Sequence, residues 1–129
     1  LVVDVTRREY TIEPIDENLL KKTLGGKGLA VKLLLDRNPS GVAPFDPENH
    51  LIIATGPLSA SSVYGSSRYG VFSKSPLTRY YGESYSGGNV AYPISGTGFD
   101  AIILKGASKD HPGFSSFPRC FGDMGKRYV

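Results

Sequence analysis

The stretch Leu51-Ile52-Ile53-Ala54-Thr55 indicates how this chain folds, because it is a short, unbroken apolar run. Such runs are typical of strands that are buried within a sheet. A second apolar run, Ala101-Ile102-Ile103-Leu104-Lys105, ends at Gly106, and the segment 68–73 between the two also has the composition of a strand. These three segments predict a β-sheet with buried strands.

The N-terminal segment predicts two further strands and a first helix. Residues 1–5 and 10–14 are the expected strands, and Pro14 ends the second because it has no N–H to donate. Asp16 is a suitable N-cap for the helix that follows. This helix is expected to end at Gly25-Gly26, where left-handed backbone costs little.

Two more helices are expected further along the chain. The segment from Gly28 towards Asn38 is apolar almost all round, which is typical of a helix in the core. A third helix is expected after Gly88, with Pro93 in its first turn. Because strands lie at both ends of the pattern and helices between them, we predict an α+β fold with mixed or antiparallel β-sheets and two or three helices.

The composition is that of one globular domain. The chain has 129 residues, of which 40% are hydrophobic and 21% charged. The net charge of +3 comes from scattered basic residues, so we expect no nucleic acid as partner. No apolar run approaches the ~20 residues that cross a membrane, and no signal peptide is evident. We therefore expect a cytoplasmic protein without a membrane partner.

Few side chains suit acid–base or nucleophilic chemistry. His50 and His111 lie in polar, loop-like segments and are expected to be solvated rather than to act as general bases. Cys120 is the one cysteine, which excludes an internal disulfide and an iron–sulfur site built from this chain alone. The residues therefore predict no catalytic side chain and no metal ligand.

Anion binding by the backbone is better supported. Gly25-Gly26-Lys27-Gly28 precedes a helix and either cradles a phosphate or forms a corner between two helices. In Ser84-Tyr85-Ser86-Gly87-Gly88-Asn89 the two glycines let the backbone come close to a ligand. Arg68 either grips a phosphate with its planar fork or makes a surface ion pair. The residues alone leave these alternatives open.

Five stretches of the chain resemble the N-terminal domain of the aldehyde:ferredoxin oxidoreductase family, in the family's order and with similar spacing. One such stretch arises easily by chance, but five in order do not, so the resemblance is specific. It covers about residues 1–106, with the remainder unmatched. The matching stretches are Val3-Asp4-Val5-Thr6, Leu24-Gly25-Gly26-Lys27-Gly28-Leu29-Ala30, residues 47–58, Ser73-Lys74-Ser75-Pro76-Leu77-Thr78 and residues 98–106.

The resemblance implies a function for this region. In that family the N-terminal domain is the base on which a bis-pterin (molybdopterin-type) tungsten cofactor, less often a molybdenum one, sits. The enzymes oxidise aldehydes to carboxylic acids and pass electrons to ferredoxin. Later domains supply the cysteines of a [4Fe–4S] cluster, and these ligands are absent here.

The resemblance also implies which residues contact the cofactor. They are Arg68 at the start of a strand and Tyr85, Ser86 and Gly87 in the glycine-rich cluster. The family commonly has Asn at the position of Tyr85, so a backbone contact is expected there in place of a side-chain amide. The corner at Gly25-Gly26 has no ligand role that the resemblance transfers.

The expected domain organisation is a partial pterin-binding domain over residues 1–106 and an irregular C-terminal tail over residues 107–129. Such a chain is expected to be inactive by itself, as a fragment, a truncated reading frame or one member of a split enzyme. A missing partner chain or a homo-oligomer would then complete it. The alternative is a non-catalytic binding or structural module that keeps the fold without the redox site.

Overall fold

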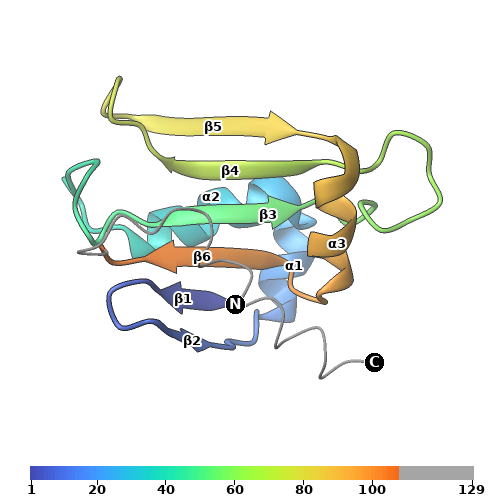
Figure 1. Cartoon of the computed structure of the whole chain (residues 1–129), viewed down its shortest axis with the longest axis horizontal. Helices are drawn as coiled ribbons and strands as arrows, with labels where there is room; N and C mark the ends of the chain where they lie inside the picture. The colour runs from blue at the N-terminus through green and yellow to red at the C-terminus, as the bar shows by residue number, and fades with distance from the viewer. Residues whose placement is uncertain (108–129) are drawn as a thin grey trace.

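The computed structural model describes residues 1–107. A single six-stranded sheet has the order β2-β1-β6-β3-β4-β5, which Figure 1 shows from its lower to its upper edge. Neighbouring strands are antiparallel, except β1 and β6, which are parallel. The predicted α+β class with a mixed sheet is therefore confirmed. The strands are β1 (Val2–Asp4), β2 (Glu9–Thr11), β3 (Leu51–Thr55), β4 (Tyr69–Lys74), β5 (Tyr81–Ser86) and β6 (Ala101–Lys105).

Three α-helices accompany the sheet: α1 (Glu17–Thr23), α2 (Gly26–Arg37) and α3 (Ala91–Gly96). A short 3₁₀ helix, η1 (Gly88–Val90), leads into α3. α2 lies across one face of the sheet, behind β3 and β4 in Figure 1, whereas α3 stands at the end of the sheet where β3 ends and β6 begins. The predicted helix after Gly88 is thus confirmed, and Pro93 occupies its first turn.

The main core lies between α2 and the sheet. Leu29 and Ala30 of α2 are fully buried against Ile52 of β3, Phe72 of β4 and Ile103 of β6. Full burial of a leucine, isoleucine or phenylalanine side chain stabilises the fold by about 1.5–3 kcal/mol. The apolar runs that predict the strands thus also supply the surface on which α2 packs.

A smaller cluster lies on the opposite face. Ile102 is buried there with Leu1, and Ile94 and Phe99 from the α3 region pack against them. Ile53 of β3 is only partly buried on this face. Helix α3 therefore covers one end of this face.

The α1–α2 corner follows the prediction with one difference. Asp16 caps α1, with its side chain accepting a hydrogen bond from Asn18 N at 3.0 Å. The first left-handed residue is Leu24 (φ 59°), ahead of Gly25 (82°) and Gly26 (53°). Helix α2 consequently begins at Gly26, two residues earlier than predicted.

The structure corrects three other predictions. Strand β5 was not predicted, because its residues are Tyr, Gly, Glu and Ser and none of them is fully buried at this edge of the sheet. Helix α2 is not surrounded by the core on all sides as predicted, since Leu35 is 72% exposed while Leu34 is buried. The reason is that α2 lies against the sheet on one side only. The second strand is also shorter than expected and ends at Thr11.

Within residues 1–107, no helix is long and apolar enough to cross a membrane. The predictions for His111, Cys120 and the tail from residue 108 onward lie outside the described residues.

Candidate functional site

The four predicted site residues meet at one end of the sheet. Arg68 lies directly before β4, and Tyr85 and Ser86 are the last residues of β5. The ladder pairs Tyr69 with Ser86, so the next position outward brings Arg68 opposite Gly87. Residues that are about twenty positions apart in the sequence are thereby held side by side.

Gly87 lies against the Arg68 side chain. A Cβ added at Gly87 would lie 3.7 Å from Arg68 Nε and 3.8 Å from Arg68 Cδ. It would also lie 3.3 Å from the carbonyl oxygen of Ser67, which is tighter than ordinary contact. Gly87 therefore leaves a small space beside the guanidinium that a side chain would fill.

The guanidinium of Arg68 is exposed, and within residues 1–107 it makes no ion pair with a carboxylate. The surface ion pair considered from the sequence is therefore not found in the described part of the chain. An exposed, planar cation beside a glycine backbone is suited to binding an oxyanion such as a phosphate.

Two serines that sequence reasoning did not single out fasten this arrangement. Ser59 Oγ donates to the carbonyl oxygen of Arg68 at 2.9 Å, and Ser59 is 2% exposed. Ser67 Oγ donates to the carbonyl oxygen of Gly88 at 2.7 Å. The first bond ties the start of β4 to the loop before it, and the second ties that loop to the end of β5. The abundance of serine in residues 59–67 is the one sequence signal for them.

The Tyr85 side chain faces the α2 side of the sheet. Its ring meets the ring of Phe72 edge-on, with centroids 5.8 Å apart and an interplanar angle of 83°. Burial raises the pKa of the Tyr85 hydroxyl, and the negative charge of Glu83 raises it further. Because the ring is engaged with Phe72, the contact that the resemblance implies for Tyr85 stays a prediction and concerns its backbone.

A polar cluster on the same face joins β5 to α2. Lys27 Nζ lies 2.9 Å from Glu83 Oε1, and Tyr81 Oη donates to Glu83 Oε2 at 2.6 Å. Hydrogen bonds from Lys27 and Tyr81 lower the pKa of the Glu83 carboxyl, and the bond to Glu83 raises the pKa of Lys27. Sequence reasoning missed this cluster because it missed β5.

The corner at Gly25-Gly26-Lys27-Gly28 has a packing role. A Cβ at Gly28 would lie 2.7 Å from the carbonyl oxygen of Thr23, and one at Gly26 would lie 3.6 Å from Gly56 Cα. Glycine therefore allows α2 to approach both α1 and the end of β3 closely. These contacts favour the corner between two helices over the phosphate cradle.

His50 is not the solvated residue that the sequence predicts. It is 9% exposed, and Asn38 Oδ1 lies 2.8 Å from its ring Nδ1 and accepts from its backbone N at 3.0 Å. Burial lowers the pKa of the His50 imidazole, and the positive charge of Arg37 lowers it further. The polar loop context misled because His50 immediately precedes the central strand β3 and is covered by the end of α2.

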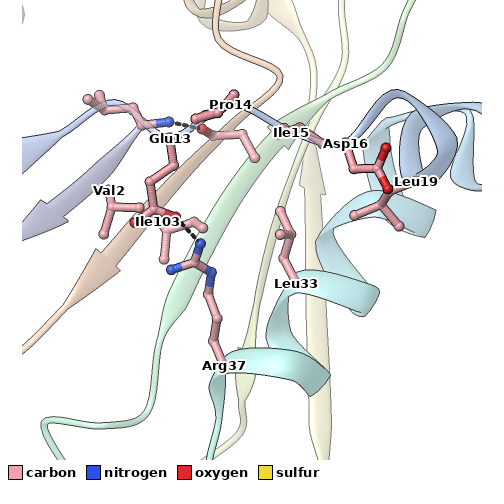
Figure 2. Close-up of a pocket in the computed structure, with 11 residues that line it drawn as sticks. Val2, Glu13, Pro14, Ile15, Asp16, Leu19, Leu33, Arg37 and Ile103 are labelled. Atoms are coloured by element: carbon pink, nitrogen blue, oxygen red, sulfur yellow. Dashed lines mark hydrogen bonds and ion pairs between the residues drawn. The ribbon is translucent and has the colours of Figure 1, made fainter.

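Arg68 does not line either of two hollows in the described structure. One, of about 110 Å³, is lined by Ile15, Leu19 and Leu33, with the ion pair of Arg37 and Glu13 beside it (Figure 2). The other, of about 390 Å³, lies between the α1–α2 corner and the segment before β6. Among residues 1–107, no group of three or more His, Cys, Asp or Glu side chains is arranged to hold a metal ion. Anion binding by Arg68 and the nearby backbone stays a prediction for this site.

Fold and site together define an α+β domain with an exposed arginine beside a glycine at one end of its sheet, and comparison with known proteins assigns it to a family. The sequence profile described as "Aldehyde ferredoxin oxidoreductase, N-terminal domain" matches residues 1–112. The chain is 41% identical over 107 residues to a tungsten-containing aldehyde ferredoxin oxidoreductase of Pyrococcus furiosus, covering 83% of this chain and 18% of that protein. It is 33% identical over 112 residues to an aliphatic sulfonate oxidoreductase, WOR-like subunit, of the same organism, covering 84% and 18%.

A solved structure is similar as well. The active site complex BamBC of benzoyl coenzyme A reductase, in complex with 1,5-dienoyl-CoA, has a TM-score of 0.81 and 37% identity, covering 84% of this chain and 17% of that one. This chain belongs to the aldehyde ferredoxin oxidoreductase family, within the N-terminal domain of that family. It spans about 18% of the length of the relatives that it matches.

Proposed function

We propose that residues 1–106 are part of the base that holds a bis-molybdopterin cofactor of tungsten (or molybdenum) in an oxidoreductase of the aldehyde ferredoxin oxidoreductase type. The observation that carries this proposal is the Arg68 guanidinium beside the space at Gly87, where a Cβ would lie 3.7 Å from Arg68 Nε. Residues 107–129 are proposed to be a tail outside this base. The tungsten named for the Pyrococcus furiosus relative supports the choice of metal.

The residues present fit a phosphate-bearing pterin. Arg68 would hold an anionic group of the cofactor through charge-assisted hydrogen bonds, which are about twice as strong as neutral ones. The backbone of Tyr85, Ser86 and Gly87 would lie close to the same group, since Gly87 carries no side chain. When bound, the cofactor supplies the two-electron oxidation of an aldehyde to a carboxylic acid, with ferredoxin accepting the electrons.

The role of this chain in that reaction is to bind and orient. With Cys120 as its one cysteine, the chain does not supply the ligands of a [4Fe–4S] cluster, so those come from other polypeptide. We propose that a partner chain, further sequence or a second copy completes the enzyme, and that the chain alone does not turn over aldehyde. The cytoplasmic location stays a prediction.

Binding of inorganic pyrophosphate, followed by NMR of the Arg68 side-chain Nε–H and the Gly87 amide, tests the site. Saturable shifts of both signals are expected. In Arg68→Ala, where only the Gly87 amide remains to be followed, its shift should disappear. Both shifts should persist in Arg79→Ala, which removes another exposed arginine from the turn between β4 and β5. Unchanged signals in the wild type would leave the alternative, a structural module without the cofactor site.

A further inference from the structure

Strand β5 is an edge strand of the described sheet. It contains Tyr85 and Ser86 and is followed directly by Gly87, which are three of the four proposed cofactor contacts. Within residues 1–107, β5 pairs on one side only, with β4. Five of its six residues are exposed. Edge strands of this kind are held less firmly than central ones. The position of Ser86 and Gly87 beside Arg68 therefore depends on what fixes β5 in addition to its ladder.

Side chains on the α2 side of β5 supply that additional fixation. Tyr81, Glu83 and Tyr85 share this side because alternate residues of a strand face the same way. Tyr81 stacks on Phe72 with ring centroids 6.5 Å apart, and Tyr85 meets the same ring at 5.8 Å. Between these two aromatic contacts, the Glu83 carboxylate accepts hydrogen bonds from Lys27 Nζ at 2.9 Å and from Tyr81 Oη at 2.6 Å.

The Lys27–Glu83 contact differs from the others because it joins β5 to a different layer of the fold. Lys27 lies in the first turn of α2, at the corner that packs on Gly56 through Gly26. The two residues are 56 positions apart in the sequence. The contact therefore links the outer strand β5 to the corner where α2 meets the end of β3.

We propose that the Lys27–Glu83 ion pair positions the end of β5, so that Gly87 is held beside the Arg68 guanidinium in the geometry that binds the cofactor's anionic group. This inference rests on the proposed function. Glu83 lies two residues before Tyr85 and four before Gly87, in backbone that rises about 3.3 Å per residue, so a shift of Glu83 carries along the strand to the site. Lys27 and Glu83 are positioning residues and make no contact with the cofactor.

Electrostatics and positioning predict opposite signs for one substitution. Glu83→Gln removes a negative charge near an anion site, and electrostatics alone would make pyrophosphate bind more tightly. If Glu83 positions the strand, the same substitution weakens binding, because the amide no longer holds the Lys27 ammonium as an ion pair. Loss of an exposed ion pair is expected to raise the pyrophosphate dissociation constant about two- to fivefold.

The experiment measures the pyrophosphate dissociation constant of the full chain for wild type, Glu83→Gln, Lys27→Met, the double variant and Lys27→Arg. We expect weaker binding in both single variants, no further loss in the double variant, and near wild-type binding in Lys27→Arg, which keeps the pair. Tighter or unchanged binding in Glu83→Gln would overturn the inference. Circular dichroism establishes that each variant is folded.

Hydrogen exchange separates this inference from the proposed function. Faster exchange of the Ser84–Gly88 amides in Glu83→Gln, with unchanged exchange in β6, is expected whether or not pyrophosphate binds. If wild type does not bind pyrophosphate, the proposed function fails, and exchange still decides the positioning role. If Arg68→Ala abolishes binding while Glu83→Gln changes neither affinity nor exchange, the positioning inference fails alone.

Discussion

Gly70 leaves the room that the ring of Phe72 occupies: a Cβ at position 70 would lie 2.4 Å from Phe72 Cζ and 3.0 Å from Tyr85 Cε1. The pairing of Gly70 with Tyr85 in the β4–β5 ladder places both rings over this one glycine. Gly70 therefore makes room both for the buried Phe72 ring and for the Tyr85 ring of the outer strand β5.

Substituting Gly70 by Ala is expected to destabilise the protein by about 1–3 kcal/mol, because the new Cβ forces the buried Phe72 ring out of its position. Chemical denaturation measures the free energy of unfolding. Gly96→Ala is the matched control, since a Cβ there meets no atom within 4 Å in the described structure. Equal effects of the two substitutions would show that the rings do not need Gly70.

Gly87→Ala is expected to weaken pyrophosphate binding clearly while it changes the free energy of unfolding little. The added Cβ lies 3.3 Å from the carbonyl oxygen of Ser67 and fills the space beside Arg68. The titration and a denaturation curve on the same sample give the two quantities. A large loss of stability with unchanged affinity would show that the space at Gly87 is not needed for anion binding beside Arg68.

The one-sided packing of α2 predicts different costs for two leucines of the same helix. Leu29→Ala should cost about 2–5 kcal/mol in the free energy of unfolding, because Leu29 is 0% exposed in the core. Leu35→Ala should change it by less than about 0.5 kcal/mol, since Leu35 is 72% exposed. Comparable losses would mean that another surface covers Leu35.

The burial of His50 predicts a pH dependence. Because its folded pKa lies below the unfolded value of about 6.5, the neutral form is favoured in the fold, and its stabilising contribution is fully present above pH about 6.5. That contribution is lost as the pH falls through the folded pKa. Denaturation at several pH values should show this loss, and His50→Gln should flatten the curve in this window. An identical slope in the variant would exclude His50 as its source.

Residue patterns predict the central elements well and the edge poorly. The apolar runs at 51–55 and 101–105 coincide with β3 and β6, because burial in a sheet requires such runs. Strand β5 has little apolar signal, since its stability comes from the β4 ladder and from rings packed on Phe72. Its alternation of Tyr81, Glu83 and Tyr85 with Gly and Ser is the period-two signal that identifies it in retrospect.

The candidate site divides in the same way. Arg68 and the Gly87 region could be predicted from residue chemistry and from a family resemblance, and the structure brings them together. The Lys27–Glu83 pair could not be predicted, because it joins residues 56 positions apart and depends on the register of an unpredicted strand. The environment of His50 also depends on tertiary packing that a polar local sequence does not reveal.

The central claim, that this chain is a cofactor base, is tested most directly by metal and pterin analysis. Tungsten and molybdenum are measured by inductively coupled plasma mass spectrometry on anaerobically purified protein, and pterin by its fluorescence after oxidation. We predict one of the two metals together with pterin in the wild type, and a clear reduction of both in Arg68→Ala. Neither metal nor pterin in folded wild-type protein, purified from a host that makes the cofactor, would contradict the account.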